Sequence, residues 1–113
     1  ARLTEQAKAY IEEHYKESDL SADSLCRCLN VSAAYFSTIF KREVGMSFVA
    51  YLTKIRLEHA LELLRTTEDK TYIIASRVGY MEPNYFSYVF KKQYGISPSK
   101  YRAEMSVKEK NED

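Results

Sequence analysis

Residues 35–42 read YFSTIFKR, and fifty positions later residues 85–92 read YFSYVFKK. The same register continues through a glycine, a serine and a tyrosine, so that eight of the seventeen pairs between residues 35–51 and 85–101 are identical. Two unrelated amphipathic helices would not share so many positions by chance. The chain therefore contains two copies of one unit, and two similar surfaces suit a ligand that is itself periodic.

Hydrophobic spacing predicts helix along almost the whole chain. Apolar residues recur every three or four positions, and serine, asparagine or glycine stands where most of the expected helices begin or end. We expect helices from Leu3 to about Lys16, after Ser21, from Ser32 to Gly45, from Ser47 to about Thr66, around Ile74, before Gly95, and a short one after Ser97. Asn30 and Gly79 are expected at the turn inside each unit, because both residue types tolerate the left-handed conformation. The predicted fold class is all-α.

The helices group into two helix-turn-helix subdomains joined by a long central helix. We expect a first subdomain at residues 1–46, a linker helix at 47–66, a second subdomain at 67–104, and a charged tail at 105–113 that frays at its end. A helix of roughly 19 residues spans about 28 Å, so the linker can hold two subdomains apart.

Composition bounds the class of protein. Hydrophobic residues make up 45% and charged residues 29% of the 113 residues, which is ordinary for a folded domain. No apolar run approaches the roughly 18 residues that cross a bilayer, and the N-terminus does not resemble a signal peptide. We therefore expect a cytoplasmic protein with no membrane contact. The first residue, Ala1, suggests a fragment of something longer, although removal of an initiator methionine explains it equally well.

The net charge of +1 hides two basic regions. Residues 27–56 and residues 77–102 each carry five basic residues and one acid, whereas ten of the other fourteen acids lie near the start and in the middle of the chain. Each repeat is therefore locally cationic, which suits a polyanionic partner.

The second helix of each pair has one apolar face and one face of small or hydrogen-bonding residues that ends in a lysine. In a helix-turn-helix, that second helix lies in the DNA major groove. Serine and threonine bond to either base type, asparagine pairs with adenine, and lysine suits phosphate. The structural alternative is that these are the solvated faces of ordinary helices. The faces are Ala34, Ser37, Thr38 and Lys41 in the first copy, and Asn84, Ser87, Tyr88 and Lys91 in the second.

Longer stretches carry a family resemblance. Residues 25–51, together with IASRVGY at 74–80, PNYFSYVFKK at 83–92 and GISPSKYR at 95–102, resemble the C-terminal DNA-binding domain of AraC/XylS-family transcription regulators. The resemblance implies seven helices in two homeodomain-like subdomains, with two recognition helices in successive major-groove segments. It also implies an N-terminal sensor or receiver domain that is missing from this fragment. The pattern is more similar to the receiver-linked branch, that of two-component response regulators.

The resemblance also assigns site residues. It implies base readout by Ala34, Ser37, Thr38, Asn84, Ser87 and Tyr88, and DNA backbone contacts by Ser32, Tyr35, Lys41, Arg42, Tyr85, Lys91, Lys92 and Ser97. Two departures from the family pattern stand out. Glu82 precedes the second recognition helix and is a poorer cap than the usual Asp or Ser. Ile73 stands where a polar residue is common, and is a candidate contact for a partner.

Catalytic and metal-binding alternatives are weaker. Some relatives join this module to a methyltransferase with a reactive cysteine, but a reactive thiolate needs a neighbouring base or cation. Arg27 lies between Cys26 and Cys28 but points away from both on a helix, and the histidines are remote in sequence, so we expect both cysteines to be small buried hydrophobic residues. Two cysteines and scattered histidines do not supply a metal site. We expect no enzyme activity, no metal and no cofactor.

The sequence thus predicts a domain that binds double-stranded DNA at an asymmetric site and regulates transcription, as activator or repressor, with RNA polymerase as an expected further partner. The alternative is a helical protein-interaction module that uses the same faces. Salt separates the two, because DNA binding weakens steeply as salt rises.

Overall fold

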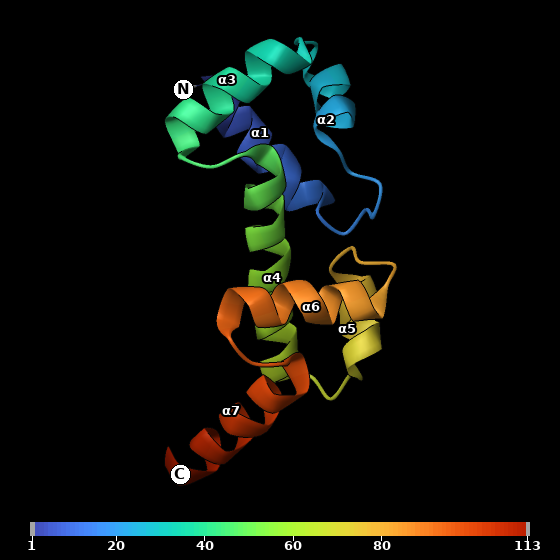
Figure 1. The fold of residues 1–113 in the computed structure, drawn as a ribbon, viewed down its shortest axis with the longest axis vertical. Helices are drawn as coiled ribbons and strands as arrows, with labels where there is room; N and C mark the ends of the chain where they lie inside the picture. The colour runs from blue at the N-terminus through green and yellow to red at the C-terminus, as the bar shows by residue number, and fades with distance from the viewer. Residues whose placement is uncertain (1, 113) are drawn as a thin grey trace. The chain divides into compact units, whose positions relative to one another are not determined.

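The computed structural model describes residues 2–112, which form helices joined by short turns (Figure 1). The helices are α1 (Arg2–His14), α2 (Ala22–Leu29), α3 (Ala33–Val44), α4 (Phe48–Thr66), α5 (Thr71–Arg77), α6 (Pro83–Tyr94) and α7 (Pro98–Glu112). No strand occurs in this range, so the prediction of an all-α fold with seven helices is confirmed. The chain packs as two compact units, Ala1–Arg56 and Leu57–Asp113, and α4 contributes residues to both.

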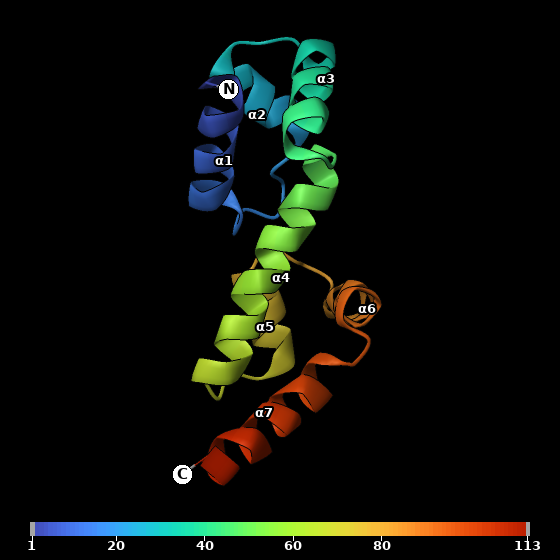
Figure 2. The same cartoon turned by 90° about the vertical axis from the view of Figure 1, so that its left-hand side faces the viewer.

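In the first unit, α1 packs against both members of the pair α2 and α3 (Figure 2). The repeated aromatic positions form the centre of this core. Phe36 and Phe40 are almost fully buried, with ring centroids 5.2 Å apart, and the Phe48 ring lies 6.2 Å from Phe36. Burial of each phenylalanine contributes about 1.5–3 kcal/mol. The aliphatic part of the core comes from Ala7, Ile11, Leu25 and Leu52.

Local sequence signals fix the helix ends of this unit. Ser21 and Ser24 form a reciprocal capping box at the start of α2, with both hydrogen bonds 3.0 Å long. Asn30 ends α2 in the left-handed conformation, with φ of 56°, as its place in the turn predicts. Ser32 caps the start of α3, and Gly45 ends it with φ of 87°. The bounds of α3 are therefore set by the residues on both sides of it.

The second unit repeats the same construction with α5 and α6. Phe86 and Phe90 are fully buried, with centroids 5.8 Å apart, and the Tyr101 ring of α7 meets Phe90 edge-on at 6.0 Å. Gly79 lies at the turn with φ of 104°, and Gly95 ends α6 with φ of 83°. The support that α1 gives the first unit comes here from the second part of α4, through buried Leu57, Ala60 and Leu64.

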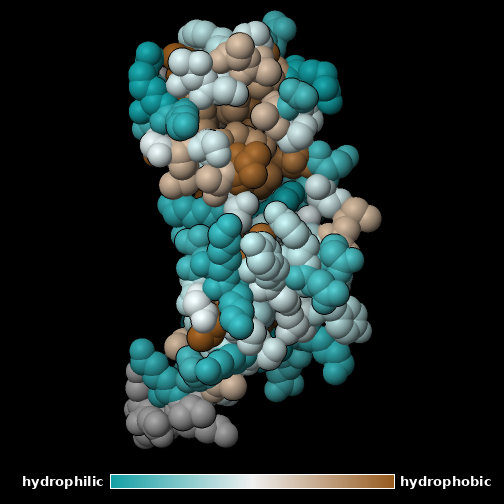
Figure 3. Space-filling model, in the orientation of Figure 1, coloured by the Kyte–Doolittle hydropathy of each residue, from teal (hydrophilic) through white to brown (hydrophobic). Residues whose placement is uncertain are grey.

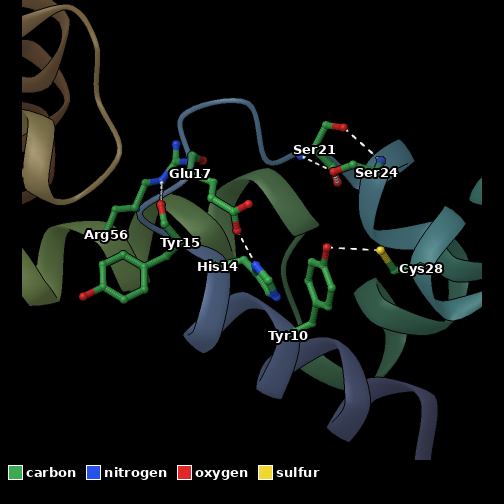
Figure 4. A network of polar contacts seen from close by, with 8 residues as sticks. All are labelled: Tyr10, His14, Tyr15, Glu17, Ser21, Ser24, Cys28 and Arg56. Carbon is green, nitrogen blue, oxygen red and sulfur yellow. Dashed lines mark hydrogen bonds and ion pairs between the residues drawn. The ribbon is translucent and has the colours of Figure 1, made fainter.

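Two arginines donate hydrogen bonds to backbone carbonyls instead of pointing into solvent. In the first unit, Arg56 is only 7% exposed. Its guanidinium donates from Nε to the carbonyl of Tyr15 and from an Nη to that of Glu17, both at 2.8 Å (Figure 4). These carbonyls follow the end of α1, where backbone acceptors lack helical partners.

Arg102 has the same role in the second unit. It donates to the carbonyls of Leu64 at 3.0 Å, Thr67 at 3.1 Å and Asp69 at 2.6 Å. Thr67 lies fifty positions after Glu17, so one of the carbonyls bonded by each arginine is equivalent in the repeat. Sequence analysis placed both residues in the basic regions and missed this structural role.

The last helix differs from the prediction. We expected a short helix after Ser97 and a frayed charged tail from residue 107, but α7 runs for 15 residues to Glu112. Ser97 and Pro98 do open it as predicted, and no glycine or proline follows to stop it. Lys, Glu, Met and Ala are good helix formers, so high charge was the wrong signal for an end.

Candidate nucleic-acid interface

The outer face of α3 gathers the residues predicted for the first unit. Ala34, Ser37, Thr38, Lys41 and Arg42 are all exposed, and the last four line a shallow hollow. Thr38 donates its hydroxyl proton to the carbonyl of Ala34 at 3.1 Å. That hydroxyl therefore offers its lone pairs outward, together with the threonine methyl group.

The outer face of α6 is more aromatic. Tyr85 is 55% and Tyr88 61% exposed, Asn84 is exposed beside them, and Ser87 is half-buried. Lys92 places its Nζ 6.0 Å from the centroid of the Tyr88 ring. In the view of Figure 3, the surface around α6 is coloured mostly from teal to white, because lysine is hydrophilic and tyrosine only weakly so on this scale.

Each recognition face ends in a pair of exposed cations. Lys41 and Arg42 lie in the last turn of α3, and Lys91 and Lys92 lie in the last turn of α6. Cations at this end of a helix also interact favourably with its dipole, so their position is compatible with folding and with binding.

The surface charge of each repeat is lower than the sequence count indicates. Arg56 and Arg102 bind backbone carbonyls, and Arg77 forms an ion pair with Asp69 at 2.6 Å. Besides the two helix-end pairs, the exposed cations of the two regions are Arg27, Lys54, Lys100 and Arg77, of which Arg77 is held by Asp69. A polyanion would therefore meet the ends of α3 and α6 more than a uniformly basic surface.

Besides α2, three helix starts carry hydroxyl caps. Ser32 accepts from the backbone N–H of Tyr35 at 3.2 Å, Ser47 from that of Ala50 at 3.1 Å, and Ser97 from that of Lys100 at 3.2 Å. Each cap occupies one of the free N–H groups at a helix start and leaves the others for an anion. Tyr35 itself is 58% exposed on the first turn of α3.

The start of α6 is different, because its cap is a carboxylate. The Glu82 side chain accepts from the backbone N–H of Asn84 at 3.0 Å. The expected weakness of Glu82 as a cap does not prevent this bond. The negative charge of Glu82 stabilises the positive end of the helix dipole. The same charge lies next to the first residues of the face that sequence analysis assigned to DNA binding.

Met81 is an exposed hydrophobic residue that sequence analysis missed. It is 84% exposed in the turn that leads into α6. An apolar residue between Gly79 and Pro83, in a turn where polar residues are usual, was the available signal. Ile73, predicted as an exposed contact, is 39% exposed on α5.

The two cysteines have different environments. Cys26 is buried, and burial together with the nearby Asp23 carboxylate raises the pKa of its thiol. This agrees with the expected role of a small hydrophobic residue. Cys28 is exposed, with its Sγ 3.2 Å from the Tyr10 hydroxyl (Figure 4), so the same expectation is wrong for Cys28. Cys28 follows Cys26 by two residues, roughly 200° around the helix, so it lies on the side opposite the buried Cys26.

The described side chains contain no group of three or more His, Cys, Asp or Glu residues arranged to hold a metal ion. Between residues 2 and 112, every helix is too short or too polar to traverse a lipid bilayer.

Comparisons with known proteins agree with this geometry. Residues 25–104 match a family described as a helix-turn-helix domain. The uncharacterized HTH-type transcriptional regulator YisR of Bacillus subtilis is 37% identical over 107 residues, which are 95% of this chain and 37% of YisR. The chain thus spans little more than a third of the length of this curated relative.

Two solved structures share the fold over nearly the whole chain. The C-terminal domain of AraT, a response regulator from Geobacillus stearothermophilus, matches with a TM-score of 0.90 and 46% identity, over 92% of this chain and 86% of that one. The DNA-binding domain of AdpA, solved in complex with a target DNA, matches with a TM-score of 0.88 and 26% identity, over 93% and 94%.

Proposed function

The chain belongs to the AraC-type family of helix-turn-helix DNA-binding domains of transcription regulators, and on this premise we propose that it binds double-stranded DNA sequence-specifically as the output domain of a longer regulator. The observation that carries the proposal is the repeated outer face of α3 and α6. Each face has small, amide or aromatic groups near the helix start and two exposed cations at its end. This family is not a class of enzymes.

The second helix of each helix-turn-helix pair, α3 or α6, would lie in a major groove. In this geometry the N-terminal residues of the recognition helix lie nearest the bases. Ala34, Ser37 and Thr38 would then read bases from α3. With its proton given to a backbone carbonyl, the Thr38 hydroxyl would accept from the amino group of adenine or cytosine.

Readout from α6 would come from Asn84, Ser87 and Tyr88. Asparagine is suited to a bidentate pair with adenine, and the serine hydroxyl can bond to either base type. Two of the three corresponding positions differ, Ala34 from Asn84 and Thr38 from Tyr88, so we expect an asymmetric site with two short blocks about one helical turn of DNA apart.

Phosphate contacts would fix the register. The exposed Lys41, Arg42, Lys91 and Lys92 lie at the ends of the recognition helices, where cations can reach the DNA backbone. The hydroxyl-capped starts of α3 and α7, at Ser32 and Ser97, offer backbone N–H groups to phosphate. Tyr35 and Tyr85, exposed on the first turns of α3 and α6, are further backbone contacts.

The rest of the regulator would supply signal and output. Because the chain spans 37% of YisR and resembles the C-terminal domain of a response regulator, an N-terminal sensor or receiver domain is the expected partner within the full chain. RNA polymerase is the expected partner in activation of transcription, and the cytoplasm is the expected location.

Selection of bound sites from a random duplex library, at two salt concentrations, tests the proposal. We expect an asymmetric two-block motif and an affinity that falls steeply with salt, because each neutralised phosphate releases counterions. A helical protein-interaction module would give no enriched motif and a flat salt dependence.

Paired lysine variants sharpen the test. Replacement of Lys91 and Lys92 by alanine should weaken binding to all sequences alike and reduce the slope of log K against log salt by about 0.9 for each phosphate that is no longer neutralised. The matched control replaces Lys16 and Lys108, two exposed lysines outside the recognition faces. An equal reduction of the slope in both double variants would contradict a specific role for the end of α6.

A further inference from the structure

The recognition faces of the two units differ most in aromatic character. Position 88 of α6 corresponds to position 38 of α3, so a tyrosine ring replaces a threonine at the centre of the face. The Tyr88 side chain is 61% exposed, although its ring is largely apolar. Exposed aromatic rings on a face that meets a partner are more often contacts than solvated groups, because they supply apolar area at low entropic cost.

The Tyr88 ring is one end of a continuous aromatic row. The row begins in the core at Phe86, whose ring centroid lies 5.7 Å from that of Tyr80, and Tyr80 is only 8% exposed. Tyr85 lies 6.0 Å from Tyr80, and Tyr88 lies 6.5 Å from Tyr85.

Lysine completes the row on the outer side. Lys92, one turn beyond Tyr88, holds its Nζ 6.0 Å from the Tyr88 ring centroid. Tyr88 is therefore bracketed along its own helix by a tyrosine anchored to the core and by a cation. Such a ring loses little rotational freedom on binding, because its neighbours already restrict it.

The chemistry of this face matches one base pair better than the others. In the major groove, thymine presents a C5 methyl group and adenine presents the N6 and N7 pair that suits asparagine. Asn84 and Tyr88 are four residues apart, which places them next to each other on the helix surface. An amide and a ring side by side thus complement the adenine edge and the thymine methyl groups of an A·T-containing block.

We propose that the outer face of α6 reads thymine methyl groups through the Tyr88 ring, beside an adenine read by Asn84. This inference rests on the proposed DNA binding and adds the chemical class of the sequence that the second unit prefers. Tyr88 is then a specificity-determining residue, and its hydroxyl is not required.

Replacement of thymine by deoxyuridine tests the methyl contact, because it removes one methyl group and leaves base pairing unchanged. Each thymine of the selected site is replaced in turn, and the dissociation constant is measured for each duplex. One replacement in the block read by α6 should weaken binding about fourfold, the factor for burial of one methyl group.

Three variants assign that effect to the ring. Tyr88→Ala should remove the difference between thymine and deoxyuridine, whereas Tyr88→Phe should keep it. The matched control is Tyr72→Ala, which removes a tyrosine that is 56% exposed on α5 and should leave the difference intact. Circular dichroism melts check that the variants fold, as the exposure of both tyrosines predicts.

The outcomes separate the methyl readout from DNA binding itself. Binding to DNA with no enriched motif and no salt dependence would contradict the proposed function. Sequence-specific binding with no thymine in the second block, or with a deoxyuridine effect that survives Tyr88→Ala, would overturn only the methyl readout. Disappearance of the difference in Tyr88→Phe would overturn it too, because it would assign the contact to the hydroxyl group.

Discussion

Arg56 and Arg102 donate hydrogen bonds to backbone carbonyls that a helix end leaves without helical partners. The carbonyls at the ends of α1 and α4 have no helical partners, and a planar guanidinium satisfies several of them at once. A lysine would offer a single ammonium in their place. Sequence analysis assigned both arginines to the basic surface. The sequence shows that a side chain is charged, but only the fold shows whether it is buried.

Replacement of Arg102 by methionine should lower the free energy of unfolding by about 2–4 kcal/mol, because three backbone acceptors lose charged donors. Urea denaturation of the purified domain measures this change. Arg27→Met, at an exposed position of α2, should change it by less than about 0.5 kcal/mol. If both substitutions changed the free energy of unfolding equally, the hydrogen bonds of Arg102 would contribute no net stability.

At the scale of the element, helix starts and stops were the most predictable features. Asn30, Gly45 and Gly95 adopt positive φ and end α2, α3 and α6, as their residue types predict. The length of α7 was not predictable from the same signals, because its sequence contains neither an apolar period nor a stop residue. Exposure of the predicted faces followed from periodicity, but the aromatic row did not, since it depends on how Tyr80 packs beside Phe86.

The carboxylate cap of α6 gives a prediction at this scale. Glu82→Ser keeps a capping side chain and removes a negative charge from the start of the proposed recognition helix. We expect affinity for every duplex to rise, by a few fold at low salt and less at high salt, while the melting temperature changes little.

Fluorescence anisotropy at two salt concentrations measures the effect on affinity. Glu13→Ser, at an exposed position of α1, is the control for a general change in net charge. If that control raised affinity as much as Glu82→Ser, the location of the Glu82 charge would not matter.

For the whole molecule, the duplication dictates how binding should depend on the arrangement of the site. The two units follow each other in the same sense along the chain, and α4 is one helix shared by both. Their recognition faces differ at positions 34 and 84 and at positions 38 and 88. We therefore expect that the two halves of a bound site are not interchangeable.

Inversion of one block of the selected site, with its position unchanged, should reduce affinity at least tenfold, because a mismatched base pair typically costs about 1–3 kcal/mol. Competition binding with the original and inverted duplexes measures the ratio. A palindromic site that competed as well as the original would show instead that two chains bind through one unit each.

The different exposure of the two cysteines allows the first unit to be labelled at one site. Cys26 is buried and its thiol pKa is raised, whereas Cys28 is open to solvent on the same helix. A thiol-directed fluorophore should therefore attach at a single place in the folded chain without any engineering. That dye would sit on α2, outside the outer face of α3, and would report on the first unit while the second is varied.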